Sequence, residues 1–218
     1  MRNRAMRTSN DRWWKISLVI GLLAIAAGCE KSTSSTAKSN RTAGTAAAVV
    51  HSLGPAPTVS FQNLNGQTVN LAQYHGKVVL VNFWATWCEP CKSEIPELIQ
   101  LQDKFGNRNF TVLGIAMDQE GKSVVAPFVA KPQFQVGEKK VAMDYPIVLG
   151  NSNVETKFGG LLGLPTSYLI SQNGQIVKKV IGMIDAQSMG NLIQKLLSGS
   201  VQVSSLRPAA TAGRSHLG

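Results

Sequence analysis

The chain of 218 residues has little cysteine, few acidic residues and no long apolar segment. Its three cysteines cannot build a disulfide-dense scaffold, so we expect any disulfide to serve chemistry rather than to hold the fold together. A mean hydropathy of +0.01 excludes a polytopic membrane protein, and ordinary glycine and proline contents exclude a collagen-like or wholly disordered chain. The length predicts one globular domain with appendages, because domains usually hold about 100–200 residues.

Acidic residues number 12 against 22 lysines and arginines, which leaves a net charge of +10. Such an excess is typical of nucleic-acid-binding domains, but this charge is unevenly distributed. Residues 1–28 carry a net +4, residues 29–54 and 200–218 carry +2 each, and residues 55–199 carry only +2. Most of the excess therefore lies outside the segment that has a globular composition, and we expect no nucleic-acid partner.

The N-terminus has the pattern of an export signal. Basic residues precede an uncharged, largely apolar segment over residues 16–27, which is followed by Gly28 and Cys29. This segment is shorter than the roughly 20 residues that span a bilayer as a helix, and its small residues before Cys29 are typical of a cleavage site. Because the Ala-Ala-Gly-Cys ending resembles a bacterial lipobox, we predict a lipoprotein signal peptide over 1–28 with lipidation of Cys29. An uncleaved membrane anchor and soluble export with an incidental Cys29 remain alternatives.

Composition divides the rest of the chain into three parts. Residues 29–54 are rich in Ser, Thr, Ala, Lys and Asn without an apolar period, so we predict a flexible tether. Residues 200–218 have a similar composition and are predicted to be a disordered tail. Residues 55–199 are predicted to form the single folded domain.

Hydrophobic patterning within 55–199 predicts alternating strands and helices. The nearly continuous apolar runs 78–83 and 110–117 indicate strands buried on both faces. An Asn-Gly turn between 59–61 and 69–71 predicts an N-terminal hairpin. Further strands are expected at 145–149, 167–170 and 176–181, helices at 91–105, 122–131, 154–158 and 186–197, and a loop at 137–144. The predicted class is therefore α/β, with a central mixed β-sheet flanked by helices.

Two cysteines, Cys88 and Cys91, are separated by Glu89 and Pro90 at the point where a buried strand gives way to a helix. The unpaired amides and the dipole at a helix N-terminus favour an anion and lower the pKa of the first thiol. The second thiol lies close enough to attack a mixed disulfide. A zinc knuckle would need a second ligand pair at suitable spacing, and a structural disulfide with so short a loop would contribute little stability. We therefore predict a redox pair, with no metal and no cofactor beyond a Cys88–Cys91 disulfide.

Two segments resemble those of a known family. Residues 81–96 (VNFWATWCEPCKSEIP) resemble the active-site segment of thioredoxin-fold proteins of the TlpA/ResA type, and residues 163–170 (GLPTSYLI) resemble the cis-proline segment of that family. The resemblance covers about 55–199 and implies a thioredoxin-like fold with an N-terminal hairpin and a central insertion.

The resemblance also assigns roles to residues. It implies that Cys88 is the exposed nucleophile, that Cys91 is the resolving thiol and that Pro165 is a cis-proline packed against the disulfide. From the sequence alone Pro165 could equally be an ordinary proline at the start of a strand, because only about 5–6% of X–Pro bonds are cis. Pro90 and Thr166, which lie within the two motifs, are predicted to support the site.

Three further residues bear on the chemistry. Asn82 stands where thioredoxin has a buried acid, so Glu94, three residues after Cys91 on the same helix face, is predicted to carry the proton function that the resemblance implies. The alternative is an ordinary first-turn acid. Glu89 should disfavour the Cys88 thiolate, so we expect a reduction potential nearer to the roughly −270 mV of thioredoxin than to the roughly −120 mV of DsbA. Trp87 is expected at the rim, where it would shape the groove for a partner.

Three functions compete. The first is a membrane-tethered, extracytoplasmic reductase of client protein disulfides, for which the resemblance implies a transmembrane thiol donor of the CcdA/DsbD kind and clients such as apocytochrome c or copper-site assembly proteins. The second is a thiol peroxidase of the peroxiredoxin type, which expects a Pro-x-x-x-Thr-x-x-Cys motif that this chain lacks. The third is a copper carrier that uses the same two thiols, although no Met or His residues gather beside them in the sequence.

Overall fold

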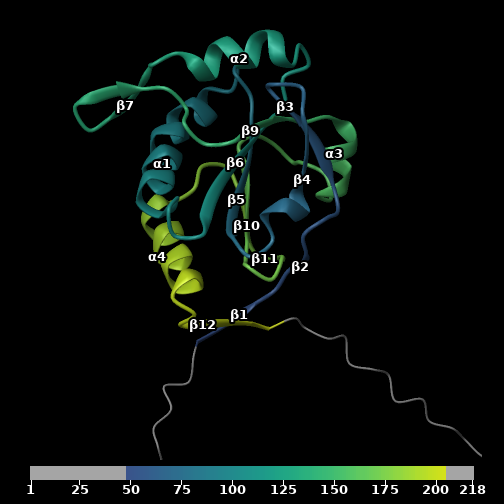
Figure 1. Ribbon diagram of the computed structural model, residues 1–218, viewed down its shortest axis with the longest axis vertical. Helices are drawn as coiled ribbons and strands as arrows, with labels where there is room; N and C mark the ends of the chain where they lie inside the picture. Colours follow the sequence, from purple (N-terminus) through teal and green to yellow (C-terminus); the bar gives the residue numbers. More distant parts are fainter. Residues whose placement is uncertain (1–47, 205–218) are drawn as a thin grey trace, which may run out of the picture. The chain divides into compact units, whose positions relative to one another are not determined.

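The computed structural model describes residues 48–204. The central strands, β5 (Val78–Trp84) and β6 (Phe110–Ala116), are buried along their whole length. Strands without a polar face must be covered on both sides, and Figure 1 shows helices on both faces of the sheet. The predicted α/β class with a helix-flanked mixed sheet is therefore confirmed.

The sheet has eight strands in the order β2-β11-β10-β5-β6-β9-β3-β4. Parallel pairing joins β5 to β6 and β6 to β9, and the other pairs are antiparallel. The remaining strands are β2 (Gly54–Pro55), β3 (Ser60–Asn63), β4 (Thr68–Asn70), β9 (Ile147–Leu149), β10 (Thr166–Ile170) and β11 (Gln175–Ile181). The predicted N-terminal hairpin is the β3–β4 pair.

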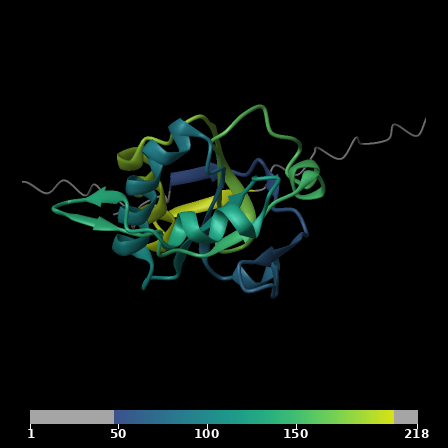
Figure 2. The ribbon, with the colours of Figure 1, turned by 90° about the horizontal axis from the view of Figure 1, so that it is seen from above.

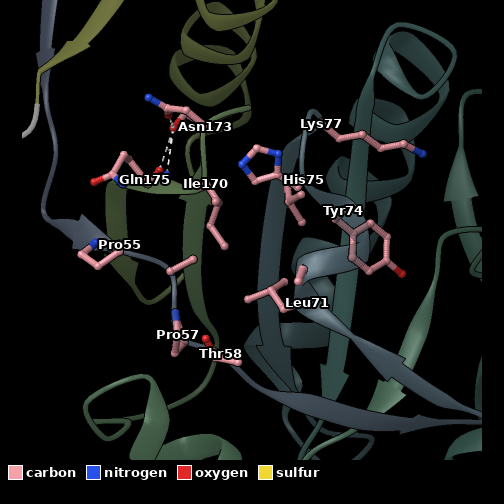
Figure 3. A pocket seen from close by; sticks show the side chains of 15 residues that line it. Pro55, Pro57, Thr58, Leu71, Tyr74, His75, Lys77, Ile170, Asn173 and Gln175 are labelled. Carbon is pink, nitrogen blue, oxygen red and sulfur yellow. Dashed lines mark hydrogen bonds between the residues drawn. The ribbon is translucent and has the colours of Figure 1, made fainter.

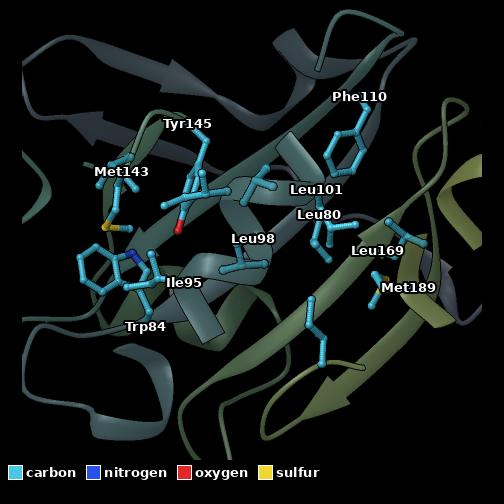
Figure 4. Close-up of a cluster of buried hydrophobic side chains, with 14 of the residues drawn as sticks. Leu80, Trp84, Ile95, Leu98, Leu101, Phe110, Met143, Tyr145, Leu169 and Met189 are labelled. Atoms are coloured by element: carbon cyan, nitrogen blue, oxygen red, sulfur yellow. The ribbon is translucent and has the colours of Figure 1, made fainter. Parts of the chain in front are cut away.

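Successive residues of β5 point to opposite faces and divide the interior into two cores. Val78, Leu80 and Trp84 pack in the larger cluster with α1 (Glu89–Phe105) and α4 (Ala186–Leu197), part of which Figure 4 shows. Val79, Val81 and Phe83 pack in the smaller cluster on the face that carries α3 (Ser152–Lys157). The remaining helical segments are α2 (Lys122–Ala130), which contributes to the larger cluster, and the 3₁₀ helix η1 (Leu71–Tyr74), which contributes to the smaller one.

The folded part extends beyond the predicted boundaries of 55 and 199. Strand β1 (Ala48–His51) pairs in parallel with β12 (Val201–Ser204), so parts of the predicted tether and of the predicted tail are strands. Val201 is buried in the larger cluster. Each segment alone is too short and too weakly patterned to predict a strand, and the pairing joins residues at opposite ends of the domain.

The predicted loop over 137–144 is also wrong in part. Strands β7 (Phe134–Val136) and β8 (Lys139–Val141) form a hairpin across Gly137, whose φ of 58° favours glycine. Figure 2 shows this hairpin extending from the body on the side of α1. Strands of three residues, one of which carries two adjacent lysines, have no period from which a strand could be predicted.

Several predictions fall outside the described residues, namely the signal peptide over 1–28, the lipidation of Cys29 and the outer parts of the tether and the tail. Within residues 48–204 no helix combines the length and the apolar character needed to cross a bilayer.

Candidate active site

The cysteine pair lies at the start of α1, just after the segment that connects this helix to β5. Cys88 is the N-cap of α1 and is bonded to Cys91 in a disulfide with a Cα–Cα distance of 5.3 Å. The backbone N–H of Cys91 donates to the Sγ of Cys88 across 3.3 Å. Pro90 occupies the first turn of the helix, where its missing N–H would have had no helical partner. A sulfur at this position therefore receives a helical N–H, which stabilises a thiolate there after reduction.

Cys88 is less exposed than the resemblance implied. Cys88 is 5% exposed and Cys91 is 1% exposed, so Cys88 remains the more accessible of the two. In the disulfide the Cys88 sulfur lies against the first turn of α1, 3.3 Å from the backbone nitrogen of Cys91.

Pro165 follows a cis peptide bond from Leu164. The next residue, Thr166, pairs with Phe83 on β5, so the cis bond lies at the level where β5 ends and the cysteine segment begins. The Pro165 carbonyl accepts a 2.8 Å hydrogen bond from the N–H of Gly182, and the buried Thr166 hydroxyl donates to the Gly163 carbonyl across 2.7 Å. These bonds hold the cis segment on both sides.

Glu94 lies one turn beyond Cys91 and is only 1% exposed. Its carboxylate accepts two hydrogen bonds, one of 2.8 Å from the Asn82 side-chain amide and one of 2.6 Å from the backbone N–H of Ile184. Burial raises the pKa of Glu94, the two hydrogen bonds oppose that effect, and the nearby charge of Glu97 adds to it. A carboxyl whose pKa is raised in this way holds its proton to a higher pH than an exposed glutamate does, which suits it to exchange a proton with a nearby thiol.

Asn82 occupies the position of the missing buried acid and binds two partners. Its side-chain amide donates to Glu94 and, across 2.9 Å, to the hydroxyl of the buried Ser167 on β10. Strands β5 and β10 and helix α1 thus meet at one side chain. Ser167 and the amide of Ile184 were not predicted, because only the pairing of β10 with β5 and the position of the loop before α4 bring them here.

Asp118 is a further site residue that the sequence analysis missed. It is buried at the end of β6, and its carboxylate accepts hydrogen bonds from both the backbone N–H and the hydroxyl of Thr86, two residues before Cys88. The sequence did hold a signal, because Asp118 is a polar residue directly after the apolar run 110–117, and sites of open α/β sheets lie at the carboxyl ends of buried parallel strands.

Glu89, which is predicted to disfavour the Cys88 thiolate, faces solvent on the first turn of α1. Its side chain is 81% exposed and forms an ion pair with Lys92 one turn along α1. Solvent and the lysine together weaken its effect on the Cys88 sulfur, because exposed ion pairs act in a high dielectric. The expected direction of its effect on the reduction potential is unchanged, but the expected size is smaller.

Large apolar side chains are exposed on the segments that surround the site. Trp87, beside Cys88, is largely exposed. Three others are also exposed and lie on segments bonded to the site: Leu162 in the loop before the cis bond, Ile181 opposite Thr166, and Met183 before Ile184. They form what we call the apolar rim: Trp87, Leu162, Ile181 and Met183.

A pocket lies at the other end of β5. Its lining includes Lys77 and Val79 at the start of β5 as well as Leu71, His75 and Ile170 (Figure 3). The cysteines follow the opposite end of this strand, so the pocket is separated from the disulfide by the length of β5. Among the described residues no three metal-ligating side chains gather at one place.

The fold and the site together define a class. A thioredoxin-like sheet that carries a CxxC disulfide at the N-terminus of a helix, level with a cis-proline, is characteristic of thiol–disulfide oxidoreductases. The AhpC/TSA family matches residues 54–179, and the chain belongs to this family.

Individual relatives agree with this assignment. The chain is 31% identical over 127 residues to the thiol–disulfide oxidoreductase ResA of Bacillus subtilis, an alignment that covers 58% of this chain and 65% of ResA. It is 27% identical over 141 residues to ResA of Bacillus thuringiensis, covering 65% and 76%. A thiol:disulfide interchange protein of the thioredoxin family from Chlorobium tepidum superposes with a TM-score of 0.57 at 29% identity, covering 66% of this chain and 96% of that one. The resemblance to the TlpA/ResA type and the assignment as a thiol–disulfide oxidoreductase are confirmed.

Proposed function

We propose that this protein is a membrane-tethered, extracytoplasmic reductase of client protein disulfides, with Cys88 as the nucleophile and Cys91 as the resolving thiol. The observation that carries the proposal is the Cys88–Cys91 disulfide at the N-cap of α1. Reduction of this bond leaves Cys88 at the helix N-terminus, where its thiolate is favoured, and leaves Cys91 buried one turn inside.

The apolar rim supports a protein as substrate. A small oxidant such as a peroxide needs no exposed apolar surface, whereas an unfolded client presents apolar side chains around its cysteines. Trp87, Leu162, Ile181 and Met183 offer such a client apolar contacts on the segments around the site. Large exposed aromatic and apolar side chains are the usual anchors of protein interfaces.

The reaction has two exchange steps. The Cys88 thiolate attacks one sulfur of the client disulfide, which forms a mixed disulfide and releases one client thiolate that takes a proton. The Cys91 thiol gives its proton to Glu94, and the resulting thiolate attacks the Cys88 sulfur. The bond between Cys88 and the client breaks, the second client thiolate leaves with a proton, and the Cys88–Cys91 disulfide is restored. The client has gained the two electrons that the dithiol has lost.

Each turnover requires a supply of electrons from outside the chain. A membrane thiol donor of the CcdA/DsbD kind would reduce the Cys88–Cys91 disulfide, and a lipid on Cys29 would keep the domain near it. Apocytochrome c is the client that the resemblance favours, since its haem-attachment cysteines must be reduced. The likeness to ResA, a thiol–disulfide oxidoreductase, supports the exchange chemistry on which these proposals rest.

Trapping of partners tests the proposed function. In a Cys91→Ser variant the mixed disulfide is not resolved, so clients should accumulate covalently on Cys88 and be released by dithiothreitol. Cys88→Ser is the matched control and should trap none. Equal trapping by both variants, or turnover of hydrogen peroxide by the reduced wild type without reduction of insulin, would contradict the proposal and favour the peroxidase alternative.

The anchor is tested separately. A Cys29→Ser variant should move from the membrane fraction to the soluble extracytoplasmic fraction while the purified domain keeps its reductase activity. If the variant stays in the membrane, residues 16–27 act as an uncleaved anchor instead. If the wild type is already soluble, the protein is not tethered.

A further inference from the structure

Two buried polar atoms near the site have no hydrogen-bond partner among the described residues. They are the indole Nε1 of Trp84 and the hydroxyl of Tyr145. Both side chains are buried in the larger core. Buried donors are nearly always paired, because an unpaired one forfeits its hydrogen bond to water without replacement. Two such donors in one place therefore require a reason.

The side chains of Trp84 and Tyr145 meet above Gly114. A Cβ on Gly114 would lie 2.6 Å from the Cδ1 of Ile147, 3.1 Å from the Trp84 Nε1 and 3.1 Å from the Cε2 of the Tyr145 ring, so the absence of a side chain there lets these three side chains pack together over the strand. In Figure 4 the Tyr145 hydroxyl and the indole nitrogen of Trp84 point toward one another. The register of β5 and β6 places Gly114 directly beside Asn82. The residue that binds Glu94 thus lies beside the strand position over which Trp84 and Tyr145 meet.

The negative charge of Glu94 affects the pKa of Tyr145. Burial raises the pKa of Tyr145 well above its usual range, and the nearby carboxylates of Glu94 and Asp144 raise it further. Tyr145 is therefore a permanent donor at any physiological pH. The titratable groups that act here are acids: Glu94 and Glu97 on α1, and Asp144, which is itself influenced by Asp103 of α1. The ionised form of Glu94 thus depends on neutral donors for its stability.

We propose that Tyr145 is a positioning residue for the proton that passes between Cys91 and Glu94. When Glu94 ionises, the Tyr145 hydroxyl donates to its carboxylate, and the Trp84 N–H donates to the Tyr145 oxygen. Only this direction works, because the indole nitrogen can only donate whereas a hydroxyl can do both. The Glu94 carboxylate can accept more than the two hydrogen bonds it receives from Asn82 and Ile184. This role rests on the proposed function of Cys91 as the resolving thiol.

The chain of donors affects one step. Ionised Glu94 takes the proton of the Cys91 thiol, and the Cys91 thiolate then displaces the leaving thiolate from the Cys88 sulfur. Removal of the Tyr145 hydroxyl makes ionised Glu94 less stable and raises its pKa, so a higher pH is needed before Cys91 can react. The first step, in which the Cys88 thiolate attacks the client disulfide, does not use Glu94, so its rate should not change.

A two-phase assay with dithiobis(nitrobenzoate) separates these steps. Reduced protein should release one coloured thiolate when Cys88 attacks and a second when Cys91 resolves the mixed disulfide. In Tyr145→Phe the midpoint of the second phase should shift to a higher pH, at about one tenth of the wild-type proton concentration, which is the effect of losing one hydrogen bond to a charged group. The first phase should be unchanged. In a Glu94→Gln background Tyr145→Phe should cause no further shift.

Tyr168→Phe is the matched control. The Tyr168 hydroxyl is also buried, but it donates to the Phe158 carbonyl in the smaller core on the opposite face of the sheet. This variant should lower the melting temperature and leave the midpoint unchanged. An unchanged midpoint in Tyr145→Phe, or a shift that persists in Glu94→Gln, overturns the role of Tyr145 alone. Release of only one thiolate by the wild type overturns the resolving role of Cys91, and this proposal with it.

Discussion

The side-chain amide of Asn82 donates a 2.8 Å hydrogen bond to the carboxylate of Glu94, and both residues are almost completely buried. This bond joins the central strand of the sheet to the helix that carries the cysteines. An amide in this position supplies a hydrogen bond without a charge of its own, so the acid of the site is on α1 rather than on β5. The first two predictions follow from this arrangement.

The pH dependence of stability should report the burial of Glu94. Because its pKa is raised in the folded protein, the contribution of the protonated carboxyl to stability is complete below the pKa of the unfolded chain, and it is lost as the pH rises through the raised folded value. In Glu94→Gln this loss should disappear, so the variant gains stability relative to wild type as the pH rises from about 4, where an unperturbed glutamate ionises. Melting temperatures of the oxidised proteins at increasing pH test the prediction, and parallel curves would contradict it.

Replacement of Asn82 should affect both stability and the Glu94 proton. Asn82→Ala removes the donor to Glu94 and the donor to Ser167, so we expect a loss of about 1–3 kcal/mol in the free energy of unfolding. We also expect a further rise in the pKa of Glu94, because the Asn82 bond lowers it. Denaturant titration and the pH profile of the second thiolate release measure the two effects. Ser167→Ala, which keeps the Asn82–Glu94 bond, should lower stability without moving the pH profile.

Asp118 should hold the segment that precedes Cys88. Asp118→Ala leaves the Thr86 N–H and hydroxyl without their acceptor, and we expect a loss of about 1.5–3 kcal/mol together with slower attack by Cys88. Asp118→Asn keeps one oxygen acceptor and should lose less. Unfolding titrations and the first-phase rate test this. Thr111→Val is a control, since it removes a buried threonine hydroxyl from the distant start of β6, and it should not slow the first phase.

The reduction potential should be low and only weakly sensitive to Glu89. We expect a value nearer to about −270 mV than to about −120 mV. Glu89→Gln should raise it by no more than about 20 mV, because the carboxylate is exposed and paired with Lys92. Redox titration against glutathione measures both, with Glu138→Gln, between β7 and β8, as the control. A wild-type potential above that of glutaredoxins would contradict the first expectation. A shift in Glu89→Gln several times larger than about 20 mV would contradict the second.

Strand β12 should be part of the stable domain. A chain that ends after residue 200 loses β12 and the buried Val201, so its free energy of unfolding should fall by at least the roughly 1.5–3 kcal/mol of one buried valine. A chain that ends after residue 204 should match the full-length protein. Thermal melts of the two truncated chains test this C-terminal boundary of the domain. Equal melting temperatures would mean that the domain ends at residue 199, as the sequence predicts.

Local patterns in the sequence were enough to predict the centre of the fold. The apolar runs that became β5 and β6 and the helical spacing of α1 and α4 each report burial over seven or more residues. The cysteine pair was equally plain, because its chemistry depends on spacing and on its place before a helix. The short strands β1, β7, β8 and β12 have no such pattern, and two of them exist only because they meet across the length of the domain.

By itself, then, the sequence determined the class of fold, the two sulfur atoms and the segment that contains the cis bond, since these depend on neighbours along the chain. Only the tertiary structure decided which groups surround them. Asn82, Glu94, Ser167 and the Ile184 amide come from three parts of the chain, and Asp118 reaches Thr86 across the end of the sheet. The physical reason is that hydrogen bonds to a buried carboxylate are made through space, by whichever donors the packing of strands and helices brings within about 3 Å.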